Sequence, residues 1–90
     1  MRAYIVLMEV SCAGKPEQVD LVRVEGAFSH EAQAVAWCQG NLTEGGYWVS
    51  EPVRHEAFTQ VIGHITGANW SVKRFTITCH QVDKLIGVLA

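Results

Sequence analysis

The chain has 90 residues, 49% of them hydrophobic and 18% charged, and its formal net charge is −2. This length allows one domain, so we expect residues 1–90 to form a single unit. The apolar content excludes a disordered chain, because enough apolar surface is available to offset the entropy lost on ordering. The slightly acidic balance argues against a nucleic-acid-binding protein, since such proteins usually carry a basic stripe that neutralises phosphates.

The three cysteines, Cys12, Cys38 and Cys79, are odd in number and widely spaced, which argues against a disulfide framework. No cysteine or histidine pair has the short spacing of a zinc site, so we predict no metal and no cofactor. Small domains that lack such supports often associate instead. The apolar content and the three tryptophans therefore predict a homo-oligomer, most simply a dimer.

An apolar run from Tyr4 to Met8 lies near the start of the chain. It is far shorter than the roughly 20 residues of a membrane-spanning helix, and it ends at Glu9 rather than at the small-residue cleavage site of a signal peptide. We therefore predict a strand over residues 2–10, no membrane association, and a cytoplasmic protein with reduced cysteines. Since both faces of this strand are apolar, it should be central in a sheet or covered on both sides.

A second strand and a helix are expected next. Residues 18–25 predict a strand that pairs with the first in an antiparallel hairpin. A helix is predicted from residue 30 to about residue 40, with Ser29 as its N-cap and Gly40-Asn41 at its end. Phe28, just before the cap, should pack against the first turns of this helix.

The middle of the chain is harder to assign. Residues 47–50 predict a third strand that continues towards Val53, although Pro52 favours a strand end or a sheet edge. The apolar residues of segment 56–66 recur at helical spacing, whereas its β-branched residues favour a strand. We prefer the helix for this segment and leave the strand open.

The last predicted strand covers residues 70–82, with Phe75, Ile77 and Cys79 on its buried face. The apolar tail, residues 83–90, should be packed down, either on this chain or on a partner subunit. The predicted fold class is α+β: a mainly antiparallel sheet of about four strands with one or two helices packed on one face.

One charged cluster, around residues 50–56, provides weak candidates for acid–base catalysis. They are His55, Glu56 and Glu51, with His64 as a further histidine. His55 and His64 are nine residues apart, which does not place them on one helix face as a zinc-binding pair would require. Charged loops are also common as solvated surface without a catalytic role, so an enzyme is the alternative interpretation and not the preferred one.

Three aromatic residues are candidates for a ligand-binding or interface surface: Tyr47, Trp48 and Trp70. Each lies beside a turn, near the expected end of a strand. Neighbouring residues of a strand point to opposite faces, so one of Tyr47 and Trp48 must leave the face that packs on the helix. Large aromatic residues at a surface are typical of binding hot spots.

These observations favour a self-associating cytoplasmic interaction module that binds a protein or a small-molecule ligand. The order of strand, Phe28-Ser29 and alanine-rich helix resembles a pattern in small bacterial and phage proteins, which implies a bacterial or mobile-element origin. The alternatives are a small enzyme with a histidine–carboxylate site and a nucleic-acid-binding accessory protein. The latter would use Arg54, Lys73 and Arg74, with tryptophans as stacking platforms.

Overall fold

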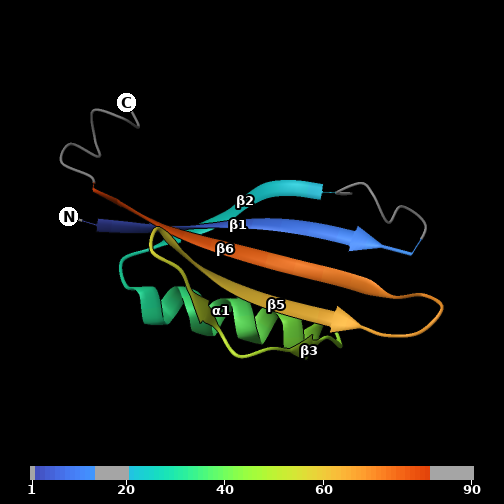
Figure 1. Cartoon of the computed structure of the whole chain (residues 1–90). Helices are drawn as coiled ribbons and strands as arrows, with labels where there is room; N and C mark the ends of the chain where they lie inside the picture. Colours follow the sequence, from blue (N-terminus) through green and yellow to red (C-terminus); the bar gives the residue numbers. More distant parts are fainter. Residues whose placement is uncertain (1, 14–20, 82–90) are drawn as a thin grey trace.

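The computed structural model describes residues 2–13 and 21–81, and within these it contains one helix and a six-stranded sheet (Figure 1). The elements, in chain order, are β1 (Arg2–Cys12), β2 (Leu21–Phe28), α1 (Glu31–Glu44), β3 (Trp48–Val49), β4 (Val53–Arg54), β5 (Phe58–Ile65) and β6 (Ser71–Gln81). The α+β class and the mainly antiparallel sheet are confirmed. The expected strand number was too low, because the third strand is divided around Pro52 and segment 56–66 adds a strand.

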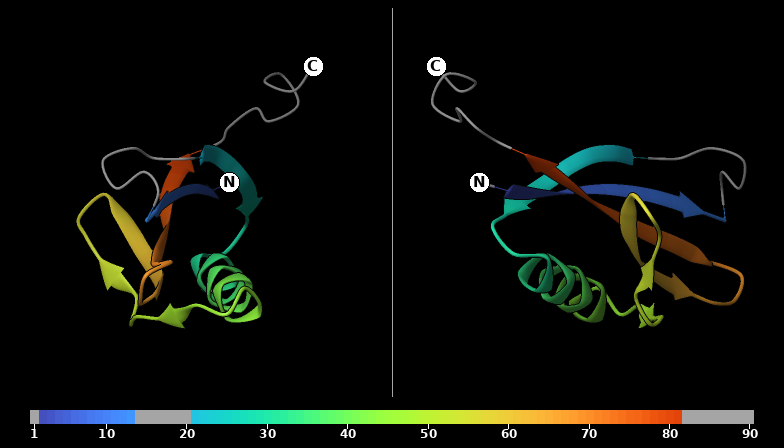
Figure 2. Two further views of the ribbon diagram at one scale, coloured as in Figure 1. Left: turned by 90° about the vertical axis from the view of Figure 1, so that its right-hand side faces the viewer. Right: turned by 60° about the vertical axis from the view of Figure 1, so that its left-hand side comes forward.

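The strand order is β2-β1-β6-β5-β3, with β4 pairing separately with β5, and all pairs are antiparallel. The predicted hairpin of the first two strands is confirmed, and β1 is central, between β2 and β6. Helix α1 lies against one face of the twisted sheet (Figure 2). No described element covers the other face, so β1 is covered on one side only within residues 2–13 and 21–81. We call this other face the open face.

The preferred helix for segment 56–66 is wrong, since Phe58–Ile65 forms strand β5 between β6 and the short strands β3 and β4. Its burial alternates: Thr59, Val61 and Gly63 are buried under the helix, and the residues between them lie on the open face. Both faces of β5 carry apolar side chains. The apolar residues therefore recur every three or four positions without a helix.

Helix α1 ends at Glu44, four residues later than expected, and the N–H of its C-cap, Gly45, donates to the carbonyl of Asn41. The extension is stabilised by packing, because Leu42 completes a buried stripe with Ala34 and Cys38 at a spacing of four residues. The predicted cap is also wrong. His30 occupies the N-cap position without a side-chain cap, and Ser29 Oγ lies 3.0 Å from His30 Nδ1.

The core lies between α1 and the four long strands, and Phe75, Leu42, Val6 and Val61 are among its largest fully buried side chains. Phe28 packs near Trp37, with ring centroids 6.0 Å apart, and Trp37 also contacts Phe75 edge-on.

The close approach of helix and sheet depends on Gly63 of β5. A Cβ atom at this position would lie 2.7 Å from Leu42 Cδ2 and 2.9 Å from Tyr47 Cβ, closer than side chains normally pack. The glycine therefore leaves the space that the end of the helix and the following turn occupy.

Burial of β6 follows the prediction for Phe75 and Ile77 but not for Cys79, which is exposed. Cys79 has the orientation of the buried residues but lies at the end of the strand, at the edge of the helix-covered area. The prediction for tail 83–90 lies outside the described residues. Within the described ranges, no helix has the length and apolar content needed to cross a membrane.

Candidate functional site

A pocket of about 120 Å³ lies where β1 begins, β6 ends and α1 starts. Tyr4 and Ile77 line it from the sheet, and His55 and Glu56 line it from the β4–β5 connection. The pocket exists because the helix begins here and leaves the end of the sheet uncovered. Its volume is that of about four water molecules, which suits only a small polar group.

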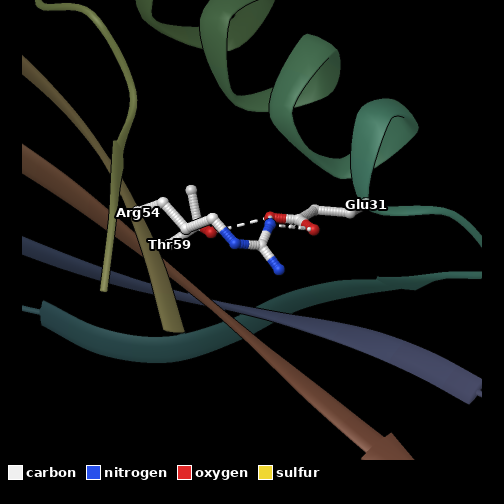
Figure 3. A network of polar contacts seen from close by, with 3 residues as sticks. All are labelled: Glu31, Arg54 and Thr59. Atoms are coloured by element: carbon white, nitrogen blue, oxygen red, sulfur yellow. Dashed lines mark hydrogen bonds and ion pairs between the residues drawn. The ribbon is translucent and has the colours of Figure 1, made fainter. Parts of the chain in front are cut away.

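One wall of this pocket is a polar network of Glu31, Arg54 and Thr59 (Figure 3). Arg54 Nη1 donates to both carboxylate oxygens of Glu31, at 2.7 and 2.6 Å, and Thr59 Oγ1 donates to Oε1 at 2.7 Å. The Thr59 hydrogen bond, followed by the Arg54 interaction, lowers the pKa of Glu31. Glu31 is therefore an ionised acceptor at neutral pH and not a proton donor.

The network joins three elements that are distant in sequence. Glu31 is the first residue of α1, Arg54 is on β4, and Thr59 is on β5 in register with Arg54. Strand β4 thus brings a guanidinium group to the start of the helix, where a carboxylate is favoured by the helix dipole. The sequence gives the position of Glu31 in the first turn but no signal for its partners, because the pairing depends on the register of β4 on β5.

Of the four acid–base candidates, His55 and Glu56 line the pocket, whereas Glu51 and His64 do not. The His55 ring packs on Phe58, with centroids 4.4 Å apart, and its Nε2 lies 3.3 Å from Gln60 Oε1. The structure thus places a histidine and two carboxylates around one pocket. The ring of His55 is oriented by a phenylalanine and an amide, and Glu31 is held by Arg54 and Thr59.

The three aromatic candidates lie in different surroundings. Tyr47 is half-buried against the core, and its hydroxyl lies 2.9 Å from Ser71 Oγ. Trp70 precedes Ser71 at the same end of the sheet, is half-buried beside Cys12, and its carbonyl accepts the N–H of Ala13. Within residues 2–13 and 21–81, no ring contact joins the three aromatic candidates.

Trp48 differs from both, because it is 74% exposed. It pairs with His64, which pairs in turn with Val72. Its neighbour Val49 packs against the core on the helix side. Strand alternation therefore places Trp48 on the open face, at its β3 edge.

The open face also carries apolar residues on β2, β1, β6 and β5, of which Leu7 and Val24 pair with each other, whereas Ile62 pairs with Arg74 and Val72 with His64. They are Ile5, Leu7, Val24, Phe58, Ile62 and Val72. Val24 is 64% exposed and Val53, on β4, is 48% exposed. Val24 is exposed and the other five are half-buried, and apolar residues gathered on one face mark an interaction surface more often than scattered ones do.

The cations proposed for nucleic-acid binding do not form a common surface. Arg54 binds Glu31, and Arg74 lies on the open face with its Nη1 3.9 Å from Glu9 Oε2. Lys73 lies on the helix side, where its Nζ donates to Asn41 Oδ1. Each cation thus has an acidic or amide partner, on separate parts of the molecule.

Among the residues that the structure describes, no three histidine, cysteine or acidic side chains are grouped as a metal site would require. Burial raises the pKa of the Cys38 thiol to about 12, so this cysteine is a core residue and not a nucleophile.

Comparison with known protein families, curated proteins and solved structures finds no match.

Proposed function

We propose that this chain is an interaction module that self-associates through the open face of its sheet. The observation that supports the proposal is the apolar content of that face, together with the absence of a covering element among residues 2–13 and 21–81. An antiparallel sheet with one solvated face normally alternates between apolar and polar residues. Here Ile5, Leu7 and Ile62 lie on the side where polar residues would be expected.

A second copy is the occupant that the chain itself supplies. Four long neighbouring strands, with β-sheet spacing, cover on the order of 500 Å² on one face. Two such faces would bury on the order of 1,000 Å², which is about the least that a biological interface needs and is typical of weak, transient ones. A reversible dimer follows from this area, and it provides the association that a small domain without disulfides often uses.

Sedimentation equilibrium over a concentration series tests this proposal. The full chain should be a dimer at micromolar concentration and dissociate on dilution. Val24→Asp introduces a carboxylate at an exposed position of the open face and should abolish the dimer. Ala36→Asp makes the same charge change at an exposed position of the helix and is the matched control.

A wild-type chain that is monomeric at all concentrations would refute the proposal. So would a dimer that Val24→Asp leaves intact. A dimer lost in Ala36→Asp but not in Val24→Asp would assign the interface to the helix side.

A further inference from the structure

Glu9 on β1 and Arg74 on β6 form an ion pair on the open face, between the two central strands of the sheet. The two residues are in register, and Arg74 Nη1 lies 3.9 Å from Glu9 Oε2. The side chain of Glu9 is 28% exposed and that of Arg74 is 44% exposed. This pair is long and partly solvated, so by itself it contributes little to the stability of one chain. Its position instead affects how two open faces can pack on each other.

The position of the pair restricts how two open faces can meet. A two-fold axis that runs along the strands, midway between β1 and β6, places Glu9 of one protomer opposite Arg74 of its partner, and Arg74 opposite the partner's Glu9. The four charges then alternate in sign, and each has two oppositely charged neighbours. A two-fold axis across the strands at the same point places Glu9 against Glu9 and Arg74 against Arg74, which is repulsive.

The axis along the strands also places the apolar residues of β1 opposite uncharged residues of the partner. Leu7 pairs with Thr76 and Ile5 pairs with Thr78 across the two central strands. In the facing copy these positions exchange, so that Leu7 of one protomer lies over the Thr76 of its partner. Threonine offers a methyl group to such a contact, and no charged group is placed against Leu7 or Ile5.

We propose that two copies of this chain pack open face to open face about a two-fold axis parallel to the strands, with Glu9 and Arg74 setting the register. This inference rests on the self-association proposed above and names the partner surface and its orientation. Charged groups within an apolar interface typically determine which arrangement forms rather than how tightly it forms.

A charge-reversal experiment tests this arrangement. Glu9→Arg leaves four positive groups at the centre of a homodimer, and Arg74→Glu leaves four negative groups. Each variant alone should have a dimer dissociation constant about tenfold or more above that of the wild type. Mixed in equal amounts, they should form heterodimers, because every contact between the two chains is then attractive.

Mixing separates this effect from damage within one chain, because each chain keeps its own repulsive pair in the mixture. Glu44→Arg, a charge reversal at an exposed residue of α1, is the control and should associate as the wild type does. The double variant Glu9→Arg/Arg74→Glu restores both pairs and should form homodimers even if a single variant folds poorly.

Sedimentation velocity of each variant and of the mixture gives the answer. Recovery of dimer in the mixture supports contact between the two charge pairs across the interface. Glu9→Gln then identifies the axis: its dimer should be weaker than that of the wild type, whereas an axis across the strands would remove the repulsion between the two Glu9 residues and make it stronger. Single variants that dimerise like the wild type, or a mixture and a double variant that both stay monomeric while the wild type dimerises, would overturn it and leave the proposed self-association standing. A wild type that is monomeric in the same runs would refute both.

Discussion

Replacing Gly63 with alanine should destabilise the fold although it adds one methyl group. The new Cβ would lie 2.7 Å from Leu42 Cδ2 and 2.9 Å from Tyr47 Cβ. The Leu42 side chain can rotate, but Tyr47 Cβ is fixed to the backbone, so β5 or the turn after α1 must shift. Overpacking of this kind costs about 1–3 kcal/mol of unfolding free energy.

Gly40→Ala is the matched control, because it is the same chemical change at an exposed position of α1. No atom lies within 4 Å of a Cβ built there. Alanine is the better helix former, so this variant should be more stable by about 0.5–1 kcal/mol. The same glycine-to-alanine substitution is thus expected to lower the unfolding free energy at position 63 and to raise it at position 40.

Urea unfolding followed by tryptophan fluorescence, at one fixed protein concentration, measures both variants. A double-mutant cycle with Leu42→Ala makes the test specific: the Gly63→Ala cost should be smaller when Leu42 is already truncated. A Gly63→Ala variant at least as stable as the wild type would refute the close approach of helix and strand. Equal costs in both backgrounds would exclude Leu42 as the obstructing side chain.

Three further predictions concern pH, association and thiol reactivity. The pKa of Glu31 is lowered in the fold from 4.5, so its stabilising effect is present above that pH and lost below it; unfolding free energies of wild type and Glu31→Gln should differ at pH 7 and converge in acid, and parallel curves would contradict this. Trp48→Ala should change the unfolding free energy of the monomer by less than about 0.5 kcal/mol but weaken the dimer in sedimentation. A Trp48→Ala variant that is clearly less stable but dimerises as the wild type does would refute an interface role for Trp48. Cys79 should react with a thiol reagent in the native protein and Cys38 only after unfolding, as mass-spectrometric mapping would show.

The sequence predicts the outer elements of the fold well and its middle poorly. Strand β1 could be found from its continuous run of apolar residues, β6 from its alternation, and α1 from its alanine content. Segment 56–66 could not, because its apolar residues, divided between two faces of a strand, happen to recur at the spacing of a helix. Gly40 predicts an end of α1 that is four residues too early, since the packing of Leu42 against Gly63 overrides the local preference of glycine.

The candidate sites were likewise predictable only in part. Alternation between Tyr47 and Trp48 predicts that one of the two leaves the helix side, and the structure shows that Trp48 does. The contacts of Glu31 with Arg54, and of Glu9 with Arg74, depend on strand register and could not be predicted from spacing along the chain. The interface role of Tyr47, Trp48 and Trp70 stays a prediction.

Methyl NMR spectra of the full chain during dilution test self-association through the open face, because they show which surface changes when copies separate. We expect concentration-dependent shifts for Ile5, Leu7 and Val72 on the open face. Methyl groups in the core, such as those of Val61, should shift little. Spectra that do not change with concentration, or changes confined to the helix side, would contradict self-association through the open face.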